Sequence, residues 1–411
     1  MKTVEQHISD VLDLVRPLDP IELDLLRAHG GVLAEPVASP VSLPAFDNSS
    51  MDGYAVAAAD VAQATAQAPV RLPVVADIPA GDPSATAVRR GHCARIMTGA
   101  PLPRGADAVV PVEWTDGGQA EVAISRPVRP GNAVRRVGED VEKGTTVVHR
   151  GARVGGAELA VLAAVGRRAV RVHPRPRVVV LSTGAELVEP GNPIGPGQIW
   201  ESNSYMLTAA ALDAGCAAYR HGFVGDDPAT VLRTIEDVLV QADIVLTTGG
   251  VSMGAYDVVK EVLSGLGTVR FEQVAVQPGK PQGLGTVGDP ATPILTLPGN
   301  PVSSFVSFYL FVLPALRRLR GLPPDPLPSV HARLAAPVRH SPPGRRSYLR
   351  AVLEYDHAAG GTGYTAAPVS RQGSHQLSAL AEVNALVVVP ENTTELPEGS
   401  VVEVLQLPTG A

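Results

Sequence analysis

Residues 174–320 alternate between short apolar runs and segments with a helical period. Most of the apolar runs carry polar residues only at their ends, which is typical of strands buried on both faces. This strand–helix alternation predicts a mostly parallel, doubly wound sheet with helices on both faces, and we assign this α/β domain to residues 174–322. The predicted strands are 177–182, 243–248, 268–276 and 293–297, and the predicted helices are 205–214, 228–242, 257–266 and 302–320.

The rest of the sequence predicts further domains, since 411 residues are enough for several hydrophobic cores. Residues 43–140 contain short β-like runs cut by glycine and proline, which predicts an inserted β-rich domain. Residues 323–411 follow a proline-rich linker and have a β pattern, which predicts a β-barrel-like C-terminal domain. Residues 1–42 and 141–173 are expected to form one discontinuous, elongated domain. Its predicted helices cover 4–15, 155–166 and a segment from an Asp19 cap, with Pro20 next, to Gly30 and Gly31.

Charge and cysteine content restrict the cellular setting. A formal net charge of −7 and the lack of a lysine- or arginine-rich run argue against a nucleic-acid partner. The most apolar stretch, 305–316, is shorter than the roughly 20 residues that span a bilayer, so no membrane association is expected. The two cysteines, Cys93 and Cys216, lie far apart and fit free thiols in a reducing cytosol. We therefore expect a cytoplasmic protein, and the histidine spacings typical of zinc sites are lacking.

Four glycine-rich turns border the predicted strands of the α/β domain. Ligands of open parallel sheets bind outside the carboxyl ends of the strands, where these turns are expected to lie. Glycine lets the backbone approach a ligand, and free N–H groups and hydroxyls donate to phosphate oxygens. Taken singly, each turn is also explained as a tight connection, but four at one edge indicate an anion site. The turns are 182–186, 247–252, 277–281 and 297–304.

Carboxylates accompany these turns. Glu186, Asp226 and Asp257 would repel a phosphate unless a cation lay between, which indicates Mg²⁺ on a pyrophosphate group. Helix capping explains Asp227 better and is an equal alternative for Asp257. A P-loop is excluded because its Gly-Lys pair must be followed by Ser or Thr, whereas Lys280 precedes a proline. No GxGxxG follows the first strand, so a generic kinase or dehydrogenase is disfavoured.

Compact loops outside the α/β domain also combine glycine, hydroxyl and charged residues. In chain order, these loops and the turns read FDNSSMDGYA, RIMTGAP, RRVGEDV, STGAEL, NSY, DDP, TTGGVSMGAYD, QPGKP, LPGNPVSSFVSF and GSHQLSALAEVNAL. The series resembles the molybdopterin molybdenumtransferase family, which includes the bacterial MoeA proteins and the E domain of gephyrin. The motifs run in the family's order and cover nearly the whole chain.

The resemblance implies a homodimer of four-domain subunits, whose α/β domain is similar to that of the molybdopterin adenylyltransferases (MogA-like). It also implies a reaction in which adenylylated molybdopterin and molybdate are the substrates, Mg²⁺ assists cleavage of the phosphoanhydride, and AMP and molybdenum cofactor are released. The adenylyltransferase and apo-molybdoenzymes are the partners to expect. The alternative within the same fold is a non-catalytic, molybdopterin-binding dimeric scaffold.

Functional residues carry over from the resemblance position by position. The pterin phosphate and adenylate are expected at Thr183, Gly184, Glu186, Thr248, Gly249, Gly250, Ser252, Pro298, Gly299, Asn300, Pro301, Ser303 and Ser304. Metal or polar ligand groups are expected at Glu186, Asp226 and Asp257, and molybdate at Lys280, Arg350 and Ser374. The second subunit is expected to contribute Asp52, Thr98 and Asp140 to the catalytic set.

The sequence departs from the family pattern at three positions near these residues. Ala185 stands where many members carry aspartate, so the negative charge of that turn rests on Glu186. Gln273 and Gln277 stand where some members carry lysine. The two glutamines lower the positive charge expected near molybdate.

Overall fold

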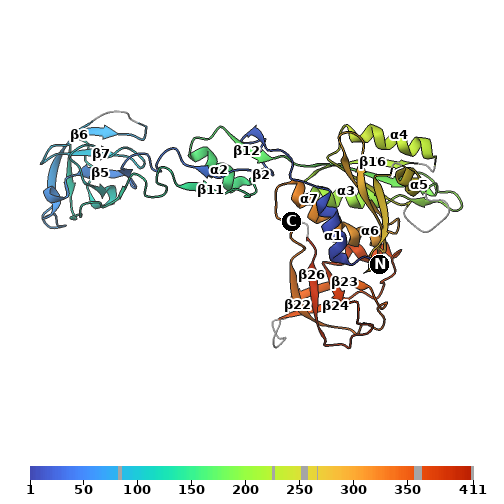
Figure 1. The fold of residues 1–411 in the computed structure, drawn as a ribbon. Coiled ribbons are helices and arrows are strands. Elements are labelled where there is room, and N and C mark those ends of the chain that lie inside the picture. The colour runs from blue at the N-terminus through green and yellow to red at the C-terminus, as the bar shows by residue number, and fades with distance from the viewer. Residues whose placement is uncertain (82–85, 225–226, 251–257, 266, 356–362, 409–411) are drawn as a thin grey trace. The chain divides into compact units, whose positions relative to one another are not determined.

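The computed structural model describes residues 1–81, 86–224, 227–250, 258–265, 267–355 and 363–408 (Figure 1). The chain divides into two compact units. The first unit comprises Met1–Glu22, Gly30–Ala34 and Arg171–Ala411, and the second comprises Leu23–His29 and Glu35–Val170.

A six-stranded sheet forms the centre of the first unit, in the order β16-β13-β17-β21-β20-β18. The first four strands are parallel, whereas β20 and β18 run antiparallel to their neighbours. The predicted mostly parallel sheet is therefore confirmed, and two of its strands, β16 and β20, were not predicted. The strands are β13 (Arg177–Thr183), β16 (Ala217–Val224), β17 (Ile244–Thr248), β18 (Val269–Gln273), β20 (Pro281–Val287) and β21 (Thr292–Leu297).

Helices cover both faces of this sheet, as a doubly wound domain requires. Successive residues of β13 alternate between two cores: Val178 and Val180 pack on one face, and Val179 and Leu181 on the other. The first core contains buried residues of α3 and of the closing helix, and the second contains those of α4 and α5. These helices are α3 (Asn203–Asp213), α4 (Pro228–Leu239) and α5 (Val258–Gly265).

The closing helix runs from Pro301 to Leu319 as α6 (Pro301–Ser307), a π-helical turn, η3 (Phe308–Val312), and α7 (Leu313–Leu319). Its length and apolar composition would suffice to span a bilayer, but 72% of its most apolar window is buried inside the protein. It packs against the sheet and against α1 (Val4–Asp13), so it is the core helix of a folded domain.

Helix α1 confirms the first predicted helix and is closed by a capping box. The Thr3 hydroxyl accepts from the Gln6 N–H at 3.2 Å, and the Thr3 N–H donates to the Gln6 side chain at 3.0 Å. Val4 and Val11 are buried in the core of the α/β domain. The discontinuous domain of residues 1–42 and 141–173 stays a prediction, as do the other domain boundaries.

The second predicted helix, from Asp19 to Gly30, is wrong. Strand β1 (Ile21–Asp24) and a turn occupy this segment, and the Leu25 N–H donates to the Arg168 carbonyl at 3.2 Å. The capping pattern is a local signal, and hydrogen bonding to a segment distant in sequence overrides it.

The strand predicted over 268–276 is divided in two. Beyond β18, the Ala275 N–H donates to the Lys2 carbonyl, and the Lys2 N–H donates to the Gln273 carbonyl, so the N-terminal segment pairs with the chain where the two parts join. The second part, β19 (Val276–Gln277), leaves the α/β sheet and pairs with β23 of the C-terminal sheet.

The C-terminal strands close into the predicted barrel. They pair in the cycle β23-β24-β22-β26-β25 and back to β23, so no edge is left open among these five described strands. Its core includes Ala351, Val387, Val389 and Val404, all fully buried. The strands are β22 (Ser329–Leu334), β23 (Arg346–Tyr355), β24 (Tyr364–Pro368), β25 (Ala385–Val389) and β26 (Val401–Gln406).

The second unit contains the predicted β-rich domain. Its main sheet has the order β8-β5-β7-β6-β9 and its own hydrophobic core, which includes Tyr54, Val110 and Ile124. The predicted helix at 155–166 is confirmed as α2 (Gly156–Ala164). The sheet strands are β5 (Gly53–Val56), β6 (Val70–Ile78), β7 (Cys93–Ile96), β8 (Ala108–Pro111) and β9 (Glu121–Ile124).

Candidate functional site

A cavity of about 780 Å³ lies at the carboxyl edge of the parallel strands in the first unit. The turns after β13, β17 and β21 line it, as predicted. The turn before β20 also reaches this edge, because β20 runs antiparallel and begins where its neighbours end. The predicted residues in the lining are Thr183, Gly184, Glu186, Thr248, Gly249, Gly250, Lys280, Pro298, Gly299, Asn300, Pro301, Ser303 and Ser374.

Two glycines let the turns approach each other closely. Gly249 has φ +94°, and a Cβ there would lie 2.4 Å from the carbonyl oxygen of Thr183. Gly250 has φ +66°, and a Cβ there would lie 2.8 Å from the Cβ of Val259. Both positions exclude larger residues, through backbone conformation and through space.

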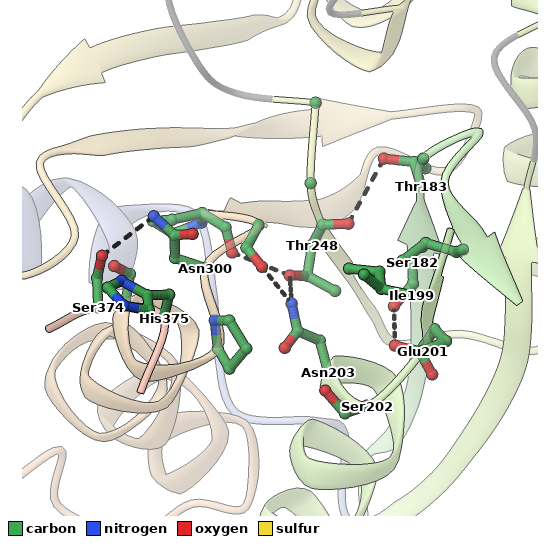
Figure 2. Close-up of a pocket in the computed structure, with 18 of the residues that line it drawn as sticks. Ser182, Thr183, Ile199, Glu201, Ser202, Asn203, Thr248, Asn300, Ser374 and His375 are labelled. Carbon is green, nitrogen blue, oxygen red and sulfur yellow. Dashed lines mark hydrogen bonds between the residues drawn. The ribbon is translucent and has the colours of Figure 1, made fainter. Parts of the chain in front are cut away.

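Asn203, the first residue of α3, ties two of the turns together (Figure 2). Its Nδ2 donates to the Thr248 hydroxyl at 3.0 Å and to the Gly299 carbonyl at 2.6 Å. The Thr248 hydroxyl also contacts the Pro298 carbonyl and the Ser304 hydroxyl, each at 3.0 Å. Ser304 is fully buried and does not line the cavity, so its role is to hold Thr248.

Glu201 is a buried carboxylate that sequence reasoning missed. It is 2% exposed, and it accepts from the Ser182 hydroxyl at 2.7 Å and from the N–H and hydroxyl of Ser204 at 2.7 and 2.6 Å. The Nε of Arg220 lies 3.8 Å away. Because these donors occupy the carboxylate, Glu201 fixes the end of β13 to the start of α3. The sequence signal was an acidic residue two positions before a helix.

Arg350 is absent from the cavity lining of this ligand-free structure, so the direct molybdate contact that the resemblance implies stays a prediction. It is fully buried in β23, where its guanidinium donates to the carbonyls of Gln376 at 2.6 Å, Gly373 at 3.2 Å and Arg371. Burial lowers the pKa of the guanidinium. Arg350 thus supports the loop that carries Ser374.

The supported loop brings Ser374 and His375 to the cavity. The Ser374 hydroxyl accepts from the Asn300 Nδ2 at 3.2 Å, and its carbonyl accepts from the Val302 N–H at 3.2 Å. The loop is therefore joined to the start of the closing helix. The barrel contributes to the cavity through this loop, and His375 was not predicted individually.

Charged groups are few in the cavity. Among its described lining residues, Lys280 is the one lysine and Glu186 is the exposed carboxylate. Three predicted residues, Asp226, Ser252 and Asp257, lie outside the described part of the chain. Within the described residues, no cluster of three potential metal-ligating side chains occurs.

Asp227 is the predicted helix cap of α4. It accepts from the Thr230 N–H at 2.8 Å and from the Thr230 hydroxyl. These two hydrogen bonds, the hydroxyl's first, lower the pKa of the Asp227 carboxyl. The capping explanation for Asp227 is thus confirmed.

The remaining predicted residues lie in the second unit. Asp52 accepts from the N–H and the hydroxyl of Thr98 at 2.7 and 2.8 Å, and the N–H bond is the first cause of a lowered pKa of Asp52. The Asp140 N–H donates to the Leu43 carbonyl at 3.0 Å. Asp52, Thr98 and Asp140 are all exposed.

Comparisons with known proteins agree with this architecture. Residues 2–166 match the MoeA N-terminal region (domain I and II), 179–318 a probable molybdopterin binding domain, and 331–407 the MoeA C-terminal region (domain IV). Molybdopterin molybdenumtransferase 2 of Mycobacterium tuberculosis (strain H37Rv) is 47% identical, over 99% of this chain and 100% of the relative. The chain belongs to the molybdopterin molybdenumtransferase family.

Other family members match over the same length. The molybdopterin molybdenumtransferase of Nostoc sp. is 39% identical over 99% of this chain and 94% of its own. Among solved structures, a molybdopterin biosynthesis MoeA protein from Pyrococcus horikoshii superposes with a TM-score of 0.83 at 33% identity, covering 99% of both chains. The predicted membership in the molybdopterin molybdenumtransferase family is confirmed.

Proposed function

We propose that this chain is a molybdopterin molybdenumtransferase, which inserts molybdate into adenylylated molybdopterin and releases AMP and molybdenum cofactor. The observation that carries the proposal is the 47% identity, over 99% of the chain, to a relative of that name. The cavity supports it, because the turns that the family resemblance assigns to the substrate meet around one space. Nothing in the comparisons favours a non-catalytic scaffold.

The cavity residues fit the two anionic parts of the reaction. The turns containing Gly249 and Gly299 line the cavity with main chain, and the backbone N–H groups of glycine-rich turns suit phosphate oxygens. Molybdate is a dianion that needs positive charge and hydroxyl donors. Lys280 and Ser374 offer both in the same lining, and Arg350 fixes the loop that carries Ser374.

Mg²⁺ is the cofactor that we propose for the cleavage step. Glu186 is exposed in the cavity and fits as a protein ligand, whereas the oxygens of Glu201 are occupied by hydroxyl and N–H donors. Mg²⁺ commonly binds through one or two carboxylates together with substrate phosphates. The bound ion would neutralise charge on the pyrophosphate oxygens.

Reconstitution tests the proposal. The purified protein, given adenylylated molybdopterin, Mg²⁺ and molybdate, should release AMP and yield cofactor that activates an apo-molybdoenzyme. Lys280→Gln should raise the KM for molybdate, whereas Lys260→Gln in α5, outside the cavity lining, should behave as the unmodified protein. A folded protein that releases no AMP and yields no cofactor would instead be the scaffold.

We further propose that the protein acts as a cytoplasmic homodimer. In this arrangement the partner subunit's Asp52, the partner's Thr98 and the partner's Asp140 complete the cavity of each first unit. The exposed positions of these residues on one chain support the idea. The molybdopterin adenylyltransferase and apo-molybdoenzymes are the proteins expected before and after it in the reaction sequence.

A further inference from the structure

Two neighbouring apolar residues, Ile199 and Trp200, line the cavity while remaining half exposed, at 54% and 53%. We call this pair the Ile199–Trp200 wall. Most of the other lining residues are glycines, prolines, or residues with hydroxyl or amide groups. Apolar side chains beside a few polar groups in a cavity are typical of ligand sites.

The wall is exposed but firmly held. Strand β15 (Ile199–Trp200) pairs in parallel with β14 (Leu187–Val188), and the Trp200 indole N–H donates to the Asn192 carbonyl at 2.8 Å. The next residue is the buried Glu201, which three hydrogen bonds anchor. The ring of Trp200 is therefore oriented before any ligand arrives, which reduces the entropic cost of binding.

The wall lies at a defined end of the cavity. Figure 2 shows Ile199 on the side opposite Ser374 and His375, with Thr248 and Asn203 between them. If molybdate binds at the Ser374 end, the dithiolene of the substrate must lie there too. The phosphates follow the dithiolene and suit the turns in the middle, so the next part of the molecule, the nucleoside, reaches the opposite end.

We propose that the Ile199–Trp200 wall binds the adenine ring of the adenylylated substrate by stacking. The inference rests on the proposed function, since it assigns one part of that substrate. A flat heteroaromatic ring suits the indole face, and the neighbouring Ile199 extends the apolar surface. Trp200 is then a residue that selects adenylylated over free pterin phosphate.

The tryptophan content of the chain allows a direct test. The sequence has two tryptophans, and the other one, Trp114, packs against the core of the second unit. In a Trp114→Phe variant, Trp200 is the sole tryptophan, so AMP should change its fluorescence. Ribose 5-phosphate, which lacks the ring, should not change it, although calorimetry should detect weaker binding.

A second measurement compares two exposed aromatic residues. Trp200→Ala should weaken AMP binding about tenfold and leave ribose 5-phosphate binding unchanged. Trp200→Phe should restore much of the affinity. Tyr219→Ala is the matched control, because Tyr219 is 54% exposed but does not line the cavity, and it should bind AMP normally.

Several outcomes would overturn the adenine assignment. The assignment would be wrong if calorimetry detected AMP binding that left the Trp200 fluorescence unchanged, or if Trp200→Ala bound AMP as tightly as the unmodified protein. Either result would leave the proposed function unaffected. If the Trp200 fluorescence responded to a pterin but not to AMP, the wall would bind the pterin ring of the substrate and not the adenine ring. If Trp200→Ala changed the oligomeric state and bound AMP with normal affinity, the wall would be a contact between protein chains and not an adenine site. If the unmodified protein neither bound AMP nor released it in the reconstitution, both proposals would fail.

Discussion

The side chain of Arg350 is fully closed to solvent, which is unusual for an arginine. The sequence had suggested a direct contact with molybdate. In the structure its guanidinium donates to carbonyls of the loop at residues 371–376 and shapes the part of the cavity that contains Ser374. These hydrogen bonds predict that Arg350 supports the anion site through the loop that it holds.

Arg350→Ala should destabilise the protein and loosen this loop. We expect a loss of roughly 3 kcal/mol in the free energy of unfolding, because several buried carbonyls lose their donors, together with a raised KM for molybdate. Denaturant unfolding and AMP release at varied molybdate measure the two effects. Arg71→Ala is the control: Arg71 forms an exposed pair with Glu121 at 3.2 Å and should cost less than about 1 kcal/mol. An unchanged KM in a folded Arg350→Ala protein would contradict the supporting role.

His7 is the second residue whose environment has a measurable consequence. It is 1% exposed, its ring packs edge-on against Phe311 with centroids 4.6 Å apart, and its Nδ1 lies 3.6 Å from a carboxylate oxygen of Glu272. Burial lowers the pKa of His7 from 6.5 to about 4, and the opposing effect of Glu272 is smaller.

The protein should lose stability as the pH falls from 6.5 to 4. In this window the unfolded chain takes up a proton at His7 and the folded chain does not. His7 therefore lowers the free energy of unfolding by up to about 3 kcal/mol as the pH falls through the window. Above pH 6.5 and below pH 4, His7 does not change how the free energy of unfolding depends on pH. His7→Leu should flatten this part of the stability curve in denaturant unfolding. The exposed His149→Leu should leave it unchanged. Equal slopes for the unmodified protein and His7→Leu would rule out His7 as the source.

At the scale of elements, the site depends on where strands end. Three turns follow parallel strands, and the turn with Lys280 reaches the same edge because β20 runs in the opposite direction. The sequence predicted all four turns at this edge, but the reason for the Lys280 turn was different from the expected one. Strand direction is set by the neighbouring strand, and the segment itself does not encode it.

Gly249→Ala should separate the effect of close packing from that of backbone conformation. Gly249 and Gly191 have nearly the same positive φ, +94° and +95°, but a Cβ at Gly249 meets the Thr183 carbonyl at 2.4 Å, whereas one at Gly191 meets nothing within 4 Å. Both alanine variants should lose about 1 kcal/mol from strained backbone. Gly249→Ala should also lose AMP release, because the turns must move apart. Similar activity in the two variants would mean that the approach of the turns is unimportant.

At the scale of the whole molecule, two units have separate hydrophobic cores, and predicted catalytic residues occur in both. Glu186 and Lys280 line the cavity of the first unit, and Asp52 belongs to the second. The proposed homodimer explains this distribution, because each cavity would draw on both subunits.

Mixing two inactive variants tests that explanation. Glu186→Gln and Asp52→Asn should each abolish most AMP release. Glu186→Gln removes the proposed metal ligand, and Asp52→Asn removes the carboxylate that each subunit is proposed to contribute to the cavity of the other. After the two proteins exchange subunits, a mixed dimer contains one cavity without either change, so up to half of the activity of such dimers should return. Refolding the variants together, with each refolded alone as the control, measures this. No recovery in verified mixed dimers would argue that each cavity uses residues of one chain.

The sequence by itself determined the family, the alternating α/β domain, the barrel, the β-rich domain and most of the cavity lining. These features depend on periodicity and on glycine, proline and hydroxyl residues at fixed places, all of which are local signals. Helix α1 and strand β13 followed from their own residues for the same reason. The Asp19–Gly30 helix failed because local capping residues were overridden by pairing with a distant segment.

Only the tertiary structure decided which side chains face the cavity and which hold it in place. Arg350 and Ser304 proved to be supports, and Glu201, Asn203 and Trp200 were brought into the lining by neighbours that the sequence does not identify. Burial and hydrogen-bond partners depend on contacts between segments that are distant in the sequence. A motif specifies that a residue lies near a site, and packing decides whether it meets the ligand.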